Sequence, residues 1–337
     1  MTYAARITGT GSAFPPNRVT NVDLSNKLAL LDVHTSDQWI RERTGIVERR
    51  YADLSQESIP NASLAAAAAE KALLMAGKKA EEVDQIIVGT CSPDTLLPST
   101  ACRLQDKLGA RKAWAMDINA ACSGFVYGAV TATQFIMTGQ SRTVLVVGSE
   151  VLHPYLDWED RGSCILFGDG AGAAVIERVP SDSPQRILSW NLSSDGKYGD
   201  LLRIPPFYSE ENPFSDQLIC KSSKMEMNGR EIFKVAVRTL TQFAQEALDS
   251  NGFSIEDVDW FVPHQANQRI LEAVAQRLKL PAEKVLINVD RYGNTSAATI
   301  PTILDEAVRD GRIRKGQLLL VDAFGAGFTY GAMVIRW

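Results

Sequence analysis

Short apolar runs alternate with amphipathic or alanine-rich stretches along most of the chain. Four apolar runs predict buried β-strands, at Gln85–Val88, Val144–Val147, Trp260–Val262 and Leu318–Val321. The stretches between them predict helices, at Asn61–Met75, Phe125–Thr138, Glu231–Asp249, Asn267–Leu278 and Pro301–Arg309. Strands that alternate with helices predict an α/β fold.

The two halves of this pattern are alike. Asp84 and Asp259 each precede a strand and lie 175 residues apart, and the same offset carries Asn119 onto Asn294. Each half ends in a glycine-rich turn that leads into an apolar strand, at 168–176 and at 325–335. An internal duplication, with halves 1–180 and 181–337, is therefore favoured. Chance agreement between generic βαβ units is the alternative.

One stretch, Ser193 to Lys224, has no periodic pattern. It contains Pro205, Pro206 and Pro213 among many polar residues. Such a composition predicts a long loop or flap between the two halves.

Composition narrows the class of protein. The chain has 337 residues, 45% of them hydrophobic and 22% charged, with a formal net charge of −5. This balance is typical of a soluble globular protein and argues against nucleic-acid binding through phosphate contacts. No apolar run reaches the roughly 18 to 20 residues of a membrane span. The opening MTYAARITGTGS lacks an apolar stretch typical of a signal peptide, so we expect a cytoplasmic protein with no membrane partner.

Cys122 is a candidate nucleophile. It lies in the sequence Asn119-Ala120-Ala121-Cys122-Ser123-Gly124, between a predicted strand and a predicted helix. A thiol at a helix N-terminus lies near the positive end of the helix dipole, which favours the thiolate. The alternative is a small buried core residue. The other cysteines, Cys91, Cys102, Cys164 and Cys220, lack this context and the spacing of a zinc site, so we interpret them as packing residues.

Two polar residues complete a candidate site. His264 follows the strand Trp260–Val262, where a strand ends and a helix begins, as is common for catalytic groups in α/β folds. Asn294 follows Gly293 between a strand and a helix, and the offset places it opposite the turn before Cys122. A hydrogen-bonded turn residue is the alternative interpretation of each. We expect Cys122, His264 and Asn294 to meet between the halves.

The chain resembles β-ketoacyl-acyl-carrier-protein synthase III, a condensing enzyme family of the thiolase superfamily, over essentially its whole length. The resemblance depends on Ala121–Phe125, His264–Asn267, Tyr292–Ser296, Gly168–Ala173 and Ala323–Phe328. It implies a five-layer αβαβα fold and a homodimer. It also implies an acyl-CoA primer transferred to Cys122, then decarboxylative condensation with malonyl-acyl-carrier protein, without a metal or redox cofactor.

The resemblance also assigns further roles. It implies that the N–H groups of Cys122 and Ala326 hold the oxyanion, and that His264 and Asn294 stabilise the enolate. It implies CoA contacts, with Trp39 and Arg161 enclosing the adenine, at Trp39, Arg43, Thr44, Arg161, Gly229 and Asn267. Lys234 and Arg269 match residues that dock the acidic carrier protein, although each is equally typical of a solvated helix charge.

The chain departs from the family at Leu97, where the family often has a phenylalanine that reaches the partner subunit's acyl pocket. A smaller wall predicts acceptance of longer or branched acyl groups. Related condensing enzymes and acyltransferases of secondary metabolism use the same cysteine, histidine and asparagine, so they stay open as an alternative function.

Overall fold

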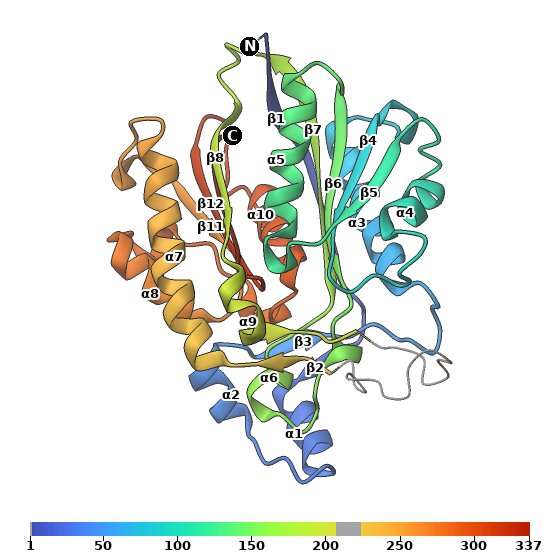
Figure 1. Cartoon of the computed structure of the whole chain (residues 1–337), viewed down its shortest axis with the longest axis vertical. Coiled ribbons are helices and arrows are strands. Elements are labelled where there is room, and N and C mark those ends of the chain that lie inside the picture. Colours follow the sequence, from blue (N-terminus) through green and yellow to red (C-terminus); the bar gives the residue numbers. More distant parts are fainter. Residues whose placement is uncertain (1, 207–223) are drawn as a thin grey trace.

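Two β-sheets form the centre of the molecule in this computed structural model, which describes residues 2–206 and 224–337 (Figure 1). The first sheet has five strands, in the spatial order β1 (Tyr3–Ala13), β7 (Gly170–Pro180), β6 (Thr143–Glu150), β4 (Gln85–Gly89) and β5 (Trp114–Ile118). The second has four, in the order β8 (Arg186–Ser194), β13 (Thr329–Arg336), β12 (Leu318–Gly325) and β11 (Trp260–Pro263).

The two sheets share one pattern of pairing. In the first, β6 is parallel to β4 and antiparallel to β7, which is antiparallel to β1. In the second, β12 is parallel to β11 and antiparallel to β13, which is antiparallel to β8. The boundary between residues 180 and 181 stays a prediction. It falls where β7 ends, before the first strand of the second sheet.

Helices cover and separate the sheets, so that the molecule has five layers. Figure 1 shows one pair on the outer face of the first sheet, one pair between the sheets and one pair on the outer face of the second. In that order the pairs are α3 (Pro60–Ala76) with α4 (Thr100–Leu108), α5 (Gly124–Met137) with α10 (Thr299–Arg309), and α7 (Gly229–Asp249) with α8 (Gln268–Leu278). The predicted αβαβα fold is confirmed.

The core follows from the apolar runs. A central cluster joins both sheets through α5 and α10, and contains Val146, Val321, Phe125 and Ile303. Burying such side chains provides the main driving force for folding. The glycine at position 11 lets β1 approach the alanine-rich helix α3 closely. A Cβ on Gly11 would lie only 2.1 Å from the Ala68 carbonyl oxygen.

A group of short elements lies at one end of the sheets, at the bottom of Figure 1. It includes β2 (Arg18–Thr20), β3 (Glu48–Arg50), α1 (Asn21–Ala29), α2 (Asp37–Thr44), α6 (Arg161–Cys164) and α9 (Val289–Tyr292). The 3-10 helices are η1 (Ala80–Glu82), η2 (Ala121–Ser123), η3 (His153–Tyr155), η4 (Gly196–Leu201), η5 (Ile255–Asp257), η6 (Ala282–Lys284) and η7 (Ser296–Ala298).

The segment predicted as one long loop contains regular structure. β8 continues to Ser194, η4 follows, and β9 (Leu202–Arg203) pairs with β10 (Glu226–Met227). The prediction of an unbroken loop from Ser193 is therefore wrong at its start, because these residues pair with β13 and with β10. Residues 207–223, which include Cys220, lie outside the described residues. In the part that is described, no helix is long and apolar enough to cross a membrane.

Candidate active site

Cys122 lies in η2, the turn that joins β5 to α5, and is 7% exposed. The preceding residue, Ala121, has a φ of 46°, a left-handed conformation that is uncommon for a residue with a side chain. The side-chain oxygen of Asn119 accepts a hydrogen bond from the Ala121 N–H at 3.3 Å and supports this turn. The sharp turn therefore places Cys122 two residues before Gly124, the first residue of α5.

Burial opposes ionisation of the nucleophile. Loss of water around the thiol raises the pKa of Cys122 to about 12, against a smaller lowering by the Ser296 hydroxyl. Burial therefore acts against the predicted effect of the helix N-terminus, because desolvation disfavours the charged form of the thiol. A buried thiol needs a proton acceptor when it reacts.

Asn294 lies in a turn that matches the Cys122 turn at the offset of 175 residues. Its side-chain oxygen accepts a hydrogen bond from the Ser296 N–H at 2.8 Å, and Ser296 has a φ of 50°. Gly293, with a φ of 66°, brings the chain so close to Leu166 that a Cβ would lie 2.8 Å from its carbonyl oxygen. Because the oxygen of Asn294 is engaged, its amide NH₂ is left to donate into the site.

His264 follows β11 and is 3% exposed. Its Nδ1 lies 2.6 Å from the hydroxyl of Thr299, the first residue of α10. Burial lowers the pKa of His264 to about 3, so the imidazole is neutral at physiological pH. A neutral imidazole whose Nδ1 is bonded in this way presents Nε2 as its remaining polar atom.

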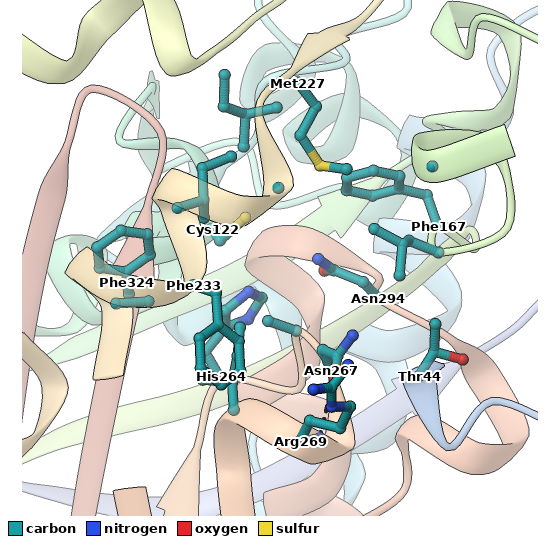
Figure 2. Close-up of a pocket in the computed structure, with 18 of the residues that line it drawn as sticks. Thr44, Cys122, Phe167, Met227, Phe233, His264, Asn267, Arg269, Asn294 and Phe324 are labelled. Carbon is teal, nitrogen blue, oxygen red and sulfur yellow. Dashed lines mark hydrogen bonds between the residues drawn. The ribbon is translucent and has the colours of Figure 1, made fainter. Parts of the chain in front are cut away.

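These three side chains line one cavity of about 590 Å³. Figure 2 shows Cys122, His264 and Asn294 around the same space, although they come from three separate loops. Of the other predicted site residues, Trp39, Arg43, Thr44, Gly229, Lys234, Asn267, Arg269 and Ala326 also line this cavity. The structure thus brings together residues from nearly the whole length of the chain.

Trp39 and Arg161, which are predicted to enclose the adenine of CoA, contact each other in this structure. The Arg161 guanidinium carbon lies 4.3 Å from the centre of the Trp39 ring, and that of Arg43 lies 4.7 Å from it. A base between Trp39 and Arg161 therefore needs the two side chains to separate. Arg161 itself does not line the cavity, although its neighbour Gly162 does.

Several cavity residues also have local structural bonds. The Asn267 side chain caps α8 by accepting from the Arg269 N–H, and it donates to the Arg43 carbonyl. The Thr44 hydroxyl donates to the Ile40 carbonyl. Lys234 forms an exposed ion pair with Glu231 at 2.8 Å. These bonds fix the side chains of Asn267 and Thr44 within the cavity wall.

The predicted oxyanion donors, the N–H groups of Cys122 and Ala326, lie on two segments that pack against each other. Gly325, at the end of β12, packs so closely on the nucleophile turn that a Cβ would lie 2.9 Å from the Cys122 nitrogen. Ala326 follows it and lines the cavity with Cys122. The N–H groups of Cys122 and Ala326 thus belong to two segments in contact, as an oxyanion hole requires.

A second cavity, of about 420 Å³, opens on the other side of Cys122. Its lining includes the apolar side chains of Leu152, Leu202, Ile204 and Met225. Leu97, the predicted pocket wall, does not line it and is 88% exposed on its own chain. The contact expected of Leu97 lies on another subunit, so this placement leaves the prediction untested.

Two cysteines differ from their predicted packing role. Cys102 is exposed on α4, so interpreting it as a core residue is wrong. Cys91 lines the second cavity together with Cys122, and its sulfur lies 3.4 Å from a carboxylate oxygen of Glu150. Cys164 is buried as predicted. Among residues 2–206 and 224–337, no group of three or more His, Cys, Asp or Glu side chains is arranged to hold a metal ion.

The sequence patterns missed three residues that contact the site: Ser296, Thr299 and Glu150. Ser296 and Thr299 lie two and five residues after Asn294, at the start of the next helix. Glu150 lies three residues after the apolar run Val144–Val147. A carboxylate so close to a buried strand is the feature of the sequence that could have identified it. Charged side chains are almost never fully buried without partners, so a carboxylate directly after a buried strand indicates a specific set of hydrogen-bond donors around it.

Together, the five-layer fold and the site define a thiolase-fold condensing enzyme. The family model "3-Oxoacyl-[acyl-carrier-protein (ACP)] synthase III" matches residues 116–196, and the model of that family's C-terminal part matches residues 248–337. The chain belongs to the β-ketoacyl-acyl-carrier-protein synthase III family and is an acyltransferase. This family initiates fatty-acid synthesis by condensation.

The relatives match the chain from end to end. β-Ketoacyl-acyl-carrier-protein synthase III of Alkalilimnicola ehrlichii is 51% identical, with all of both chains covered. The crystal structure of 3-oxoacyl-acyl-carrier-protein synthase III from Aquifex aeolicus is 43% identical, with a TM-score of 0.88, and covers 99% of this chain and 100% of its own. The corresponding structure from Thermus thermophilus is 41% identical, with a TM-score of 0.89, and covers 98% and 99%.

Proposed function

We propose that this chain condenses an acyl-CoA primer with malonyl-acyl-carrier protein, releasing CoA and CO₂ and forming a 3-oxoacyl-acyl-carrier protein. The observation that carries the proposal is the meeting of Cys122, His264 and Asn294 in one cavity. The names of the full-length relatives support the same substrates. The reaction would start fatty-acid synthesis in the cytoplasm.

In the first half-reaction, Cys122 attacks the thioester carbonyl of the acyl-CoA, and CoA leaves. The N–H groups of Cys122 and Ala326 stabilise the tetrahedral oxyanion. The acyl chain occupies the second cavity, whose apolar lining suits a short hydrocarbon. The product is an acyl-Cys122 thioester, so the enzyme works by a ping-pong mechanism.

In the second half-reaction, malonyl-acyl-carrier protein loses CO₂ and its carbanion attacks the acyl thioester. His264 Nε2–H and the Asn294 amide donate to the malonyl thioester oxygen, where negative charge develops. For Nε2 to carry the proton, Nδ1 must accept from the Thr299 hydroxyl, at 2.6 Å, in place of the bond that this hydroxyl donates to the Ser296 carbonyl at 2.9 Å. Both acyl groups arrive as substrates, and the steps require no resident metal or redox cofactor.

The other residues of the larger cavity bind the carriers of the acyl groups. Trp39, Arg43, Thr44, Arg161, Gly229 and Asn267 contact CoA, and the adenine enters when Trp39 and Arg161 separate. Lys234 and Arg269, exposed at the cavity wall, meet the acidic carrier protein. A local basic surface on an enzyme of net charge −5 would attract that partner.

We also propose that the enzyme works as a homodimer. Leu96 and Leu97 are 90% and 88% exposed, which is unusual for large apolar side chains. Contact with a second copy would bury them, and Leu97 would then bound the partner subunit's acyl cavity.

Intact-protein mass spectrometry tests the proposal. The protein is incubated with a panel of acyl-CoAs, and malonyl-acyl-carrier protein is then added. We expect one acyl group on wild-type protein, none on Cys122→Ala, and its transfer into a 3-oxoacyl-acyl-carrier protein. An acyl group that loads but is never discharged by malonyl-acyl-carrier protein would contradict the condensation and favour transfer to another acceptor, as in secondary metabolism.

A further inference from the structure

Thr329, the first residue of β13, lies where the second sheet meets the nucleophile turn. Its backbone is paired on both sides, with Gly325 of β12 and with Ser194 of β8. Its side chain lines the second cavity, as Cys122 and Ala326 do. A strand residue with neighbours on both sides is fixed in place, so its contacts with the turn determine where the turn lies.

The Thr329 side chain joins the two segments that carry the proposed oxyanion donors. Its hydroxyl lies 2.8 Å from the Ala120 carbonyl oxygen, on the nucleophile turn, and 3.3 Å from the Ala326 carbonyl oxygen. Because a hydroxyl has one proton, the shorter contact, to Ala120, is the main hydrogen bond. In the opposite direction, the Ser123 hydroxyl donates to the Thr329 carbonyl at 3.1 Å. Two hydrogen bonds therefore tie the turn to β13.

The Ala120 carbonyl is a central point of the turn. It also accepts the hydrogen bond from the Ser123 N–H that closes η2, at 3.1 Å, and a carbonyl oxygen has two lone pairs for such a pair of donors. The same peptide group carries the Ala121 N–H, which donates to the Asn119 side chain at 3.3 Å. The next peptide group carries the Cys122 N–H. Fixing the first peptide group therefore restricts the direction of the second.

The close approach at Gly325 brings these groups together at one point. A Cβ there would lie 2.7 Å from the Thr329 hydroxyl oxygen, 2.8 Å from the Ala120 carbonyl oxygen and 2.9 Å from the Cys122 nitrogen. The next residue along the chain is Ala326, the second proposed donor. The spacing between the two N–H groups depends on this contact, and an oxyanion hole works only if both donors are aimed at one oxygen.

We propose that Thr329 is a positioning residue of the oxyanion hole. Through its hydrogen bond to the Ala120 carbonyl, its hydroxyl holds the Cys122 N–H in place relative to the Ala326 N–H. In this role Thr329 transfers no proton and forms no bond to the substrate. The inference rests on the proposed acylation of Cys122, and it gives a function to a residue that the predicted site did not include.

The proposed reaction uses this hole in two steps. A tetrahedral oxyanion forms when Cys122 attacks the acyl-CoA, and again when the carbanion attacks the acyl-Cys122 thioester. Loss of CO₂ does not use it, because His264 and Asn294 stabilise the enolate. A displaced hole should therefore slow both attacks but not decarboxylation. An enolate that fails to attack takes a proton from water, leaving hydroxide and acetyl-acyl-carrier protein.

The test compares Thr329→Ser, which keeps the hydroxyl, with Thr329→Ala, which differs from it by one oxygen atom. Thr329→Val also removes the hydroxyl but keeps a branched side chain, and it takes the place of Thr329→Ala if that variant does not fold. Thr133→Ala is the control, because the Thr133 hydroxyl also donates to a backbone carbonyl at 2.8 Å, but within α5. Thermal unfolding of each variant reports on the fold.

Two rates are measured. The first is acylation by the acyl-CoA that loads wild-type protein fastest in the panel, followed by rapid quench and intact mass. The second starts from protein that is already acylated on Cys122, to which malonyl-acyl-carrier protein is added. It records the release of CO₂ and the ratio of acetyl- to 3-oxoacyl-acyl-carrier protein.

We expect Thr329→Ala to acylate about tenfold more slowly than Thr329→Ser, because its donors are displaced but not removed, whereas loss of a whole donor costs about 10²–10³-fold. Thr329→Ser and Thr133→Ala should stay within about threefold of wild type. Acylated Thr329→Ala should release CO₂ within about threefold of the wild-type rate, with about tenfold more acetyl product relative to 3-oxoacyl product.

Four results would each overturn the inference. They are equal acylation rates in Thr329→Ala and Thr329→Ser, an equal loss in Thr133→Ala, an unchanged product ratio, and a loss of CO₂ release as large as the loss of acylation. The last would mean that Thr329 supports the whole site and not the oxyanion hole. Wild-type protein that takes up no acyl group from any member of the panel would instead overturn the proposed function.

Discussion

The contact between Gly325 and the nucleophile turn predicts that Gly325→Ala impairs acylation of Cys122. A Cβ at this position would lie 2.8 Å from the Ala120 carbonyl oxygen and 2.9 Å from the Cys122 nitrogen. Both are backbone atoms, so neither can turn aside as a flexible side chain would. Gly196→Ala is the control, because a Cβ there meets nothing within 4 Å and φ is not in the left-handed region.

The size of the effect follows from these distances. Relief of the clash moves the backbone around Cys122 by roughly 0.5 Å, and such overpacking costs about 1–3 kcal/mol of stability. The same shift moves the Cys122 N–H relative to the Ala326 N–H. Loss of one oxyanion donor slows a reaction by about 10²–10³-fold, or roughly 3–4 kcal/mol in activation free energy. Gly325→Ala should therefore lose about 10²-fold in acylation rate.

The assay is rapid-quench acylation by acetyl-CoA, followed by intact mass, with thermal unfolding of the same samples. Gly196→Ala should match wild type in both measurements. An acylation rate in Gly325→Ala within about threefold of wild type would refute the reasoning, because it would mean that the turn absorbs a methyl group without moving its donors.

Three further predictions concern the same site. His264→Ala and Asn294→Ala should still acylate Cys122 but lose about 10²–10³-fold in CO₂ release from malonyl thioester, and normal decarboxylation in either would contradict their roles. The contribution of His264 to the free energy of unfolding should fall as pH decreases from about 6.5 toward about 4, by up to ~1.4 kcal/mol per pH unit. The reason is that unfolded His264, with its ordinary pKa of 6.5, binds a proton that the folded form, with a pKa of about 3, does not. Urea unfolding of His264→Gln should show a smaller slope, and an equal slope would exclude His264 as the cause. Leu97→Phe should narrow the range of acyl-CoAs that load Cys122, and an unchanged chain-length profile in the mass assay would argue against Leu97 as a pocket wall.

The sequence patterns predicted the layers of the fold because periodicity is a local property. Each of the apolar runs became a strand whose ends lie within four residues of the predicted ones, as Leu318–Val321 did within β12. The helix predicted from Asn267 begins at Gln268, because Asn267 serves as its cap. The start of the long polar segment failed for a non-local reason. Ser193 and Ser194 belong to a strand only because Thr329 and Tyr330 of β13 pair with them.

The site was predictable in its residues but not in its electrostatics. Local context identified Cys122, His264 and Asn294 as candidates, and the offset of 175 residues indicated that two of them face each other. The pKa of Cys122 depends on how much water the folded chain excludes, which no local pattern reports. The bond from His264 to Thr299 likewise joins residues 35 positions apart, through the packing of β11 beside α10.

The two matched turns explain why one site forms where two halves meet. Ala121 and Ser296 occupy equivalent positions, both have positive φ, and each turn is supported by an asparagine two residues earlier. Each such conformation costs of the order of 1–3 kcal/mol, so the surrounding structure must hold it in place. What differs between the turns is the chemistry: one carries the Cys122 thiol, whereas the other has Ala297 at that position and a hydroxyl at Ser296.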